Sequence, residues 1–158
     1  TYFNPRQFSN IHNIHCHFDT TGQEIIKQTN IISAFIAGSG TGGTLMGVSG
    51  ALKSKNIKAK IVQVQPEESN ATHGIQGIND GEDFLLDKSI IDETIYIKTK
   101  DAVARAKRLA KENGLLVGIS AGANVLAAEQ WVKENNPEHP AVTILCDRGE
   151  RYFSCYED

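Results

Sequence analysis

Apolar and polar positions alternate with different periods along the chain, and the changes of period divide it into short elements. Residues 31–36, 60–64, 94–98 and 141–145 form short apolar segments rich in β-branched side chains. Segments of this length and composition are typical of buried strands. The sequence therefore predicts four strands, separated by stretches long enough to hold helices.

Helical periodicity fills most of the intervals between these segments. Leu45, Val48 and Leu52 recur at the spacing of one helix face after the first strand. A second face is made by apolar residues of 102–110 and is closed by Asn113-Gly114, a typical helix end. A third helix is predicted over about 121–134.

One helix start is indicated by a local motif. Thr21-Gly22-Gln23-Glu24 has the form of a capping box, in which a Thr and a Glu three residues later satisfy backbone N–H groups. The motif leads into Ile25-Ile26, and we expect a short helix that begins there and ends near Gln28.

The order of these elements predicts the fold class. Strands and helices alternate along 158 residues, with no internal repeat and no low-complexity linker. Such alternation favours an α/β domain with three layers, in which a largely parallel sheet carries helices on both faces. The length fits a single domain over residues 1–158.

Composition narrows the partners and the compartment. The net charge of -3 gives no reason to expect nucleic acid or an anionic membrane as a partner, and no apolar run is long enough to cross a bilayer. The chain start has no signal-peptide pattern. Cys16, Cys146 and Cys155 are odd in number and irregularly spaced, so we expect free thiols and a cytoplasmic location.

The stretch AGSGTGGT over residues 37–44 is the strongest candidate for chemistry. It follows a predicted buried strand and precedes a predicted helix. A helix that begins at such glycines presents unpaired N–H groups and the positive end of its dipole to an anion. Without Cβ atoms the backbone can approach the anion closely, and Thr41 and Thr44 add hydroxyl donors.

Three phosphate ligands and one plain alternative can be compared for this loop, and the first of them does not fit it. A Walker A loop requires Lys after its last glycine, and Gly43 is followed by Thr44. A nicotinamide dinucleotide fits the glycines at 38, 40 and 43, with Glu67 as the acidic ribose partner. A monophosphate ester such as pyridoxal 5′-phosphate needs only the loop. The fourth interpretation is a strand-to-helix turn that binds no ligand.

Five segments together carry a resemblance to a known family. They are QFSNIHNIHCHFDTTGQEI over 7–25, GTGGT over 40–44, GIQGI over 74–78, GISAGAN over 118–124 and CDRGERYFS over 146–154. Their order and spacing resemble those of the cysteine synthase and cystathionine β-synthase family of pyridoxal-phosphate enzymes. The resemblance covers nearly the whole chain and implies the large domain of the tryptophan synthase β-like fold.

The resemblance implies roles for individual positions. Gln7 would help to bind the substrate carboxylate and Gly77 would line the substrate side of the cofactor ring. The phosphate would be held by Gly40, Thr41, Gly42, Gly43 and Thr44. A surface position is the plain alternative for Gln7.

Two further positions would lie at the ring itself. Ser120 would pack near the ring, and Cys146 would face the pyridine nitrogen, where many family members carry Ser. The plain alternatives are a helix N-cap for Ser120 and a small core residue for Cys146. Because successive strand residues point to opposite faces, we expect Cys146 to point inward and Asp147 to cap or pair at the surface.

The activity implied by the resemblance is β-replacement, in which an activated serine such as O-acetylserine is converted to cysteine by sulfide. In the family the Schiff-base lysine lies well upstream of the Gln motif, whereas only six residues precede Gln7 here. We therefore expect the lysine-bearing small domain to be absent from this chain, the isolated chain to be inactive, and the intact enzyme to be a homodimer.

Two other functional classes remain open at this point. A nicotinamide-dinucleotide domain and a non-catalytic binding or regulatory module both accommodate the glycine loop. The cluster His12, His15, Cys16 and His17 does not have the spacing of a closed metal site, so we expect no metal.

Overall fold

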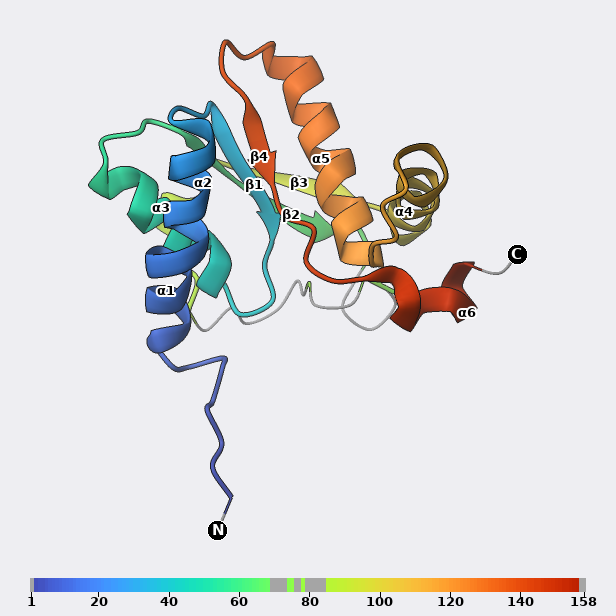
Figure 1. The fold of residues 1–158 in the computed structure, drawn as a ribbon, viewed down its shortest axis with the longest axis horizontal. Coiled ribbons are helices and arrows are strands. Elements are labelled where there is room, and N and C mark those ends of the chain that lie inside the picture. The colour runs from blue at the N-terminus through green and yellow to red at the C-terminus, as the bar shows by residue number, and fades with distance from the viewer. Residues whose placement is uncertain (1, 69–73, 76–77, 79–84, 157–158) are drawn as a thin grey trace.

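A four-stranded parallel sheet forms the centre of the molecule in a computed structural model, which describes residues 2–68, 74–75, 78 and 85–156 (Figure 1). The spatial order of the strands is β3-β2-β1-β4, and every neighbouring pair is parallel. The strands are β1 (Ala34–Gly38), β2 (Lys60–Pro66), β3 (Glu93–Ile97) and β4 (Ala141–Thr143). The four predicted strands and their parallel arrangement are confirmed, but β1 begins at Ala34 instead of Ile31 and β4 ends at Thr143 instead of Leu145.

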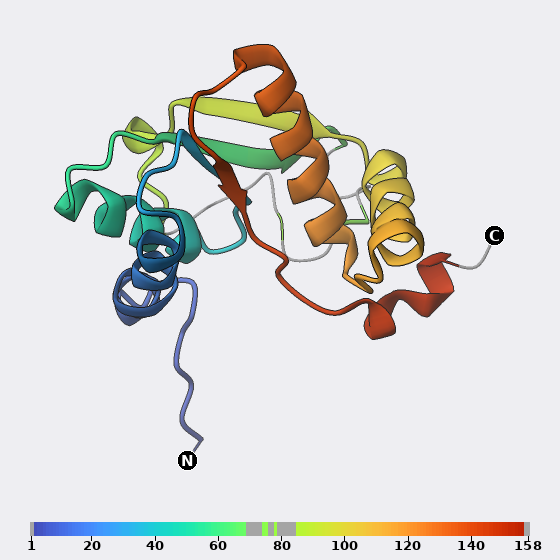
Figure 2. The same cartoon turned by 45° about the horizontal axis from the view of Figure 1, so that its top comes forward.

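Helices cover both faces of this sheet, as the alternation of elements predicts (Figure 2). One group consists of α1 (His12–His17), a π-helical turn (Phe18–Gly22), α2 (Gln23–Thr29) and α3 (Gly43–Ser54). The other consists of α4 (Thr99–Asn113) and α5 (Ile119–Asn135). Short 3₁₀ turns cover Lys88–Ile90 and Gly149–Tyr152, and α6 (Phe153–Tyr156) follows the second of them.

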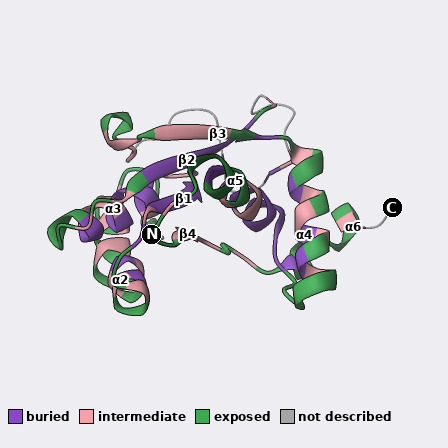
Figure 3. Ribbon diagram, turned by 90° about the horizontal axis from the view of Figure 1, so that it is seen from above, coloured by how far each residue is buried: buried purple, intermediate pink, exposed green. Residues whose placement is uncertain are grey.

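The two faces of β1 show how the layers are built. Side chains alternate along a strand, so Phe35 and Ala37 pack into one core with α2 and α3, whereas Ala34 and Ile36 pack into the other with α5. All four are almost completely buried. Figure 3 shows buried positions along β1 and β2 and exposed positions on the outer faces of the helices. β1 is therefore buried on both sides.

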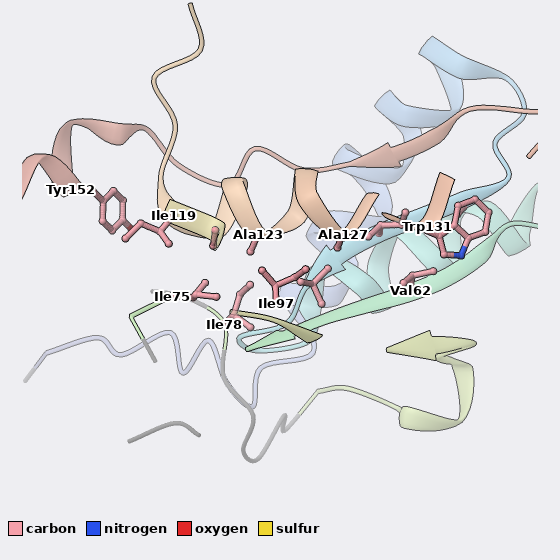
Figure 4. Packing of buried hydrophobic residues seen from close by; sticks show 13 residues of the cluster. Val62, Ile75, Ile78, Ile97, Ile119, Ala123, Ala127, Trp131 and Tyr152 are labelled. Carbon is pink, nitrogen blue, oxygen red and sulfur yellow. The ribbon is translucent and has the colours of Figure 1, made fainter. Parts of the chain in front are cut away.

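The core beneath α5 extends to the carboxyl ends of the strands. Ile119, Ala123 and Ala127 of α5 point toward the sheet in Figure 4, and Trp131 closes one end of this cluster. Tyr152 lies at the other end, beyond Ile119, and is also buried. This end of the core supports the floor of the cavity described below.

The capping-box prediction at the start of the chain is wrong. Thr21 lies inside the π-helical turn, and no side chain caps α2. The Thr21 hydroxyl instead makes a hydrogen bond of 3.0 Å with His17 Nδ1. The helix starts earlier, at His12, and the π-helical turn joins α1 to α2 without a break, because C-cap and N-cap residues there have helical dihedral angles.

The stack of α1 and the π-helical turn on α3 depends on close backbone contact. A Cβ added at Gly47 would lie 2.6 Å from the His17 Cβ and 2.6 Å from the Ile14 carbonyl oxygen. Glycine therefore brings α1 against the first turns of α3. In the described part of the chain, no helix is long and apolar enough to cross a membrane.

Candidate cofactor site

The glycine loop lies between β1 and α3, as the sequence predicts, and its geometry requires glycine. Gly42 is the N-cap of α3 and has φ +85°, a left-handed conformation that β-branched residues avoid. A Cβ there would come within 2.8 Å of the Leu86 backbone nitrogen. Both the backbone conformation and the lack of space therefore exclude a larger residue at position 42.

The first turn of α3 presents free backbone donors. Met46 N–H donates to the Gly42 carbonyl at 3.0 Å, and Gly43 N–H donates to Thr41 Oγ1 at 3.2 Å. No hydrogen bond joins the N–H groups of Thr44 and Leu45 to any described residue. Two unbonded N–H groups at the positive end of a helix dipole form a binding site for an anion.

The hydroxyl groups of the loop are held by residues of α1. Thr41 Oγ1 accepts a hydrogen bond of 3.1 Å from Asn13 Nδ2, and Thr44 Oγ1 lies 3.2 Å from His17 Nε2. Burial lowers the pKa of His17, so its imidazole is mainly neutral at pH 7. Both contacts place polar side chains directly behind the loop.

Gln7 lies near the same loop through its backbone. Its carbonyl oxygen accepts a hydrogen bond of 2.9 Å from Asn13 Nδ2, the amide nitrogen that also contacts Thr41. The residue itself is exposed. The structure thus brings the predicted substrate residue and the glycine loop together through Asn13, although its side-chain role stays a prediction.

Cys146 lies across the carboxyl ends of the strands from the loop. The residue is exposed overall, but its Sγ faces Asn124 Nδ2 at 3.4 Å and also makes a hydrogen bond with Ser120. Burial raises the pKa of the Cys146 thiol and outweighs these hydrogen bonds, which lower it. The thiol is therefore neutral at pH 7, and the alternative of a closed core position does not describe it.

Ser120 is not a helix N-cap. α5 begins at Ile119 with Gly118 as its N-cap residue, so Ser120 is the second residue of the helix. Its side chain is buried and bonded to Cys146. The structure therefore places Ser120 and Cys146 side by side, and their roles at a cofactor ring stay predictions.

Asn124 was not singled out by the sequence, yet it connects the two halves of the site. It is completely buried, and its Oδ1 accepts a hydrogen bond of 2.8 Å from Gly38 N–H at the end of β1. Its Nδ2 donates to the Ile144 carbonyl at 3.0 Å and to Cys146 Sγ. One side chain thus fixes the start of the glycine loop relative to the segment that carries the thiol.

The expectation for Asp147 is wrong. β4 ends at Thr143, so strand alternation no longer applies at 146 and 147. Asp147 Oδ2 accepts a hydrogen bond of 2.5 Å from the Tyr152 hydroxyl, and its Oδ1 is buried with no partner among the described residues. Burial and Asp147 together raise the pKa of Tyr152 to about 12. The carboxylate faces inward instead of pairing at the surface.

A cavity of about 620 Å³ opens between these elements. Its wall combines Gly38 from the end of β1, Ser120 from α5, and both Cys146 and Asp147. The rest of the wall is formed by Gly74, Ile78, Ile119, Arg151, Tyr152 and Cys155. The cavity is large enough for a substituted pyridine ring and meets the glycine loop at Gly38.

Gly77 and Glu67 are two further residues to which the sequence analysis assigns a ligand role. Gly77 lies outside them, although its neighbours Gly74 and Ile78 line the cavity. Glu67, the ribose partner of the dinucleotide alternative, forms an exposed ion pair with Lys98 at 3.4 Å. Among the described residues there is no group of three side chains that could hold a metal ion, and the absence of a metal stays a prediction.

The fold and this site belong to a known class of enzymes. Residues 1–147 match the sequence profile of the pyridoxal-phosphate dependent enzyme family, so the chain belongs to that family. The relationship favours pyridoxal phosphate over a nicotinamide dinucleotide as the ligand of the loop.

Individual relatives narrow the class further. The chain is 44% identical to cysteine synthase B of Campylobacter jejuni over 96% of its length, and 41% identical to a cysteine synthase of Staphylococcus aureus over 97%. Among solved structures it resembles the cysteine synthase of Entamoeba histolytica, with 36% identity, a TM-score of 0.89 and 97% of this chain covered. A hydrogen sulfide-producing enzyme of Fusobacterium nucleatum is similar, with 35% identity, a TM-score of 0.89 and 96% covered.

The chain spans about half the length of these relatives. It covers 53% of each of the two cysteine synthases and 48% and 55% of the two solved structures. The comparison therefore concerns the part of the fold that holds the glycine loop and the cavity.

The described residues fit pyridoxal phosphate. The loop offers two unbonded N–H groups and a left-handed glycine that suit a phosphate, and a neutral thiol lines the adjoining cavity. A neutral partner suits a pyridine nitrogen, which accepts a hydrogen bond when it is unprotonated.

Proposed function

We propose that the chain is the cofactor-binding part of a pyridoxal-phosphate dependent cysteine synthase, which makes cysteine or a related amino acid from an activated serine such as O-acetylserine and sulfide. The observation that carries this proposal is the left-handed Gly42 with two unbonded N–H groups at the start of α3, in a loop whose first residue, Gly38, is joined through Asn124 to the Cys146 thiol. The family and the cysteine synthase relatives support it.

We assign the phosphate to the loop residues and the ring to the cavity. The N–H groups and the Thr41 and Thr44 hydroxyls bind the phosphate, which fixes the position of the whole cofactor. Apolar side chains of the cavity wall, such as Ile119 and Tyr152, exclude water from the ring. Pyridoxal phosphate supplies the electron sink for the β-replacement chemistry.

Cys146 and its neighbours control the protonation of the ring nitrogen. The raised pKa of the thiol keeps Cys146 neutral, so no carboxylate charge favours a proton on the ring nitrogen from that position. Asn124 and Ser120 hold the thiol in place. We assign Gln7, whose backbone carbonyl contacts Asn13, to the substrate carboxylate and Gly77 to the substrate side of the ring.

The Schiff-base lysine is assigned to a region outside this sequence. None of the lysines of the chain lines the cavity among its described residues, and nearly all are exposed. An amine that forms a Schiff base must be held near the aldehyde in its neutral form, which requires burial or a neighbouring cation. We further propose a homodimer and a cytoplasmic location for the complete enzyme, in line with three free cysteines.

The experiment combines an activity assay with chemical trapping. The purified full-length protein is incubated with O-acetylserine and sulfide, and cysteine formation is measured. In parallel it is reduced with borohydride in the presence of pyridoxal phosphate, and the labelled peptide is mapped. We expect cysteine formation and a label on one lysine outside the 158 residues.

Two variants separate specific from general effects. Thr44→Val removes a loop hydroxyl and should weaken pyridoxal phosphate binding by about 2- to 10-fold. Thr29→Val is the matched control, because that hydroxyl donates to the Ile25 carbonyl at 2.8 Å within α2. A label on a lysine of this chain, or a full-length protein that binds no pyridoxal phosphate, overturns the proposal.

A further inference from the structure

Two residues of α1, one helical turn apart, contact the two hydroxyls of the glycine loop. Asn13 contacts Thr41, and His17 contacts Thr44. The sequence motifs single out neither contact. We propose that Asn13 and His17 are positioning residues, which orient the loop hydroxyls toward a bound phosphate and make its binding depend on pH. This inference rests on the proposed function of the loop.

The orientation of the Asn13 amide follows from its partners. Gln7 contributes a backbone carbonyl, which only accepts, so the amide nitrogen must face it at 2.9 Å. The other hydrogen on the same nitrogen then points to Thr41 Oγ1 at 3.1 Å. Asn13 Oδ1 lies against Gly43, where a Cβ would approach it to 2.1 Å, so the amide is closely enclosed.

Thr41 is left with a single free function. A hydroxyl oxygen accepts up to two hydrogen bonds and donates one. Thr41 Oγ1 accepts from Asn13 Nδ2 and from Gly43 N–H, which uses both acceptor sites. No described residue accepts the hydroxyl proton, so the proton remains available to an anion at the start of α3.

The hydroxyl proton of Thr44 is also free to bind an anion, but only in some protonation states of His17. Its Nδ1 lies 3.0 Å from Thr21 Oγ1 and its Nε2 lies 3.2 Å from Thr44 Oγ1. In one neutral tautomer Nε2–H donates to Thr44, and the Thr44 proton is free. In the other tautomer Thr44 donates to Nε2, and the proton is used. When the ring is protonated both nitrogens donate, so Nε2–H always donates to Thr44 and the Thr44 hydroxyl proton is always free to bind an anion.

Anion binding and protonation of His17 therefore favour each other. Burial lowers the pKa of His17 in the free protein, and a bound dianion raises it again. By linkage, the affinity of the loop for an anion of constant charge must then rise as the pH falls through the pKa of His17. None of the charged or titratable residues on α1, the π-helical turn, α2 and α3 makes a hydrogen bond or ion pair with His17; they are His12, His15, Cys16, Asp19, Glu24, Lys27 and Lys53.

Sulfate is the suitable probe, because its charge does not change near neutral pH, unlike that of a phosphate ester. Sulfate binding to the full-length protein, freed of cofactor, is measured by calorimetry between about pH 5.5 and 7.5. We expect binding that is about 3- to 10-fold tighter at the lower pH in the unmodified protein. His17→Gln keeps a donor near Thr44 but does not titrate, so its binding should lose this pH dependence.

His12→Gln is the matched control for His17. His12 is an exposed histidine on the same helix and contacts His15 instead of the loop, so its replacement should leave the pH profile unchanged. A pH profile of His17→Gln that equals the unmodified one overturns the role of His17. Circular dichroism on each variant establishes that it is folded.

A double-mutant cycle tests whether Asn13 acts through Thr41. Asn13→Ala should weaken sulfate binding by about 2- to 10-fold, and in the Thr41→Val background it should weaken it little further. Additive effects overturn the role of Asn13. An unmodified protein that binds neither sulfate nor pyridoxal phosphate overturns the proposed function as well, whereas binding that none of these variants alters overturns this inference alone.

Discussion

Replacement of Asn124 by Ala should destabilise the protein far more than the loss of one side-chain amide suggests. The side chain is completely buried, and it satisfies Gly38 N–H at 2.8 Å and the Ile144 carbonyl at 3.0 Å. Alanine leaves Gly38 N–H without its partner, and it leaves the Ile144 carbonyl with only the weak S–H donor of Cys146 at 3.9 Å. An orphaned buried group costs about 1–3 kcal/mol, so the pair amounts to about 2–4 kcal/mol once some water reaches Gly38 from the cavity.

Urea unfolding of the full-length protein, followed by circular dichroism, measures this loss. Asn135→Ala is the matched control, because Asn135 lies on the same helix, is exposed and donates to the Trp131 carbonyl at 3.0 Å. Its replacement should change the free energy of unfolding by less than about 0.5 kcal/mol. Asn124→Asp keeps the side-chain volume but loses both donors, so it should also destabilise. Equal stabilities of Asn124→Ala and Asn135→Ala refute the reasoning.

Three further predictions concern the loop, the thiol and the cavity wall. Gly42→Val should abolish pyridoxal phosphate binding, whereas Gly114→Ala, at φ +69° with open space around it, should cost only about 1–2 kcal/mol of stability and leave binding unchanged in a fluorescence titration. Cys146→Ser keeps a neutral group and should preserve the absorption maximum of the bound cofactor, whereas Cys146→Asp should shift it. The pKa of Tyr152 is raised from 10.0 to about 12, so the folded state retains this proton more strongly and the free energy of unfolding should fall as the pH rises across that interval. Tyr152→Phe should make this decline in urea unfolding smaller, and the remainder belongs to Tyr156, whose pKa is also raised by burial; an unchanged decline contradicts the assignment.

The parts of the fold that the sequence predicts are those with strong local patterns. The apolar strand over β1, the glycine loop and the helical face of α3 all follow from residues close together in the chain. The start at His12 is missed, because α1 has no buried residue and no apolar period. It is placed by packing against Gly47 of α3, which lies far away in the sequence.

In the candidate site, too, residues in local motifs could be predicted from the sequence, whereas contacts between distant residues could not. The loop residues and Cys146 lie in motifs and could be predicted as a phosphate and ring site from the sequence. Asn124 and His17 could not be assigned their contacts, because Asn124 bonds Gly38 across 86 positions and His17 bonds Thr44 across 27. The prediction for Asp147 is wrong because β4 ends at Thr143, so the alternation of side chains along a strand does not reach position 147.

The order of the strands explains why Gly38, at the start of the glycine loop, and the Cys146 thiol line the same cavity. The chain proceeds from β1 to β2 and β3 on one side, and then places β4 on the other side of β1. The connections that follow β1 and β4 therefore leave the sheet in opposite directions, which makes this pair of strands a topological switch point, where parallel α/β sheets bind ligands. Gly38 ends β1 and Cys146 follows β4, and both line the cavity. Asn124 joins the two strand ends through its hydrogen bonds to Gly38 and Ile144, so we expect both the stability of the protein and the shape of the cavity to depend on this one side chain.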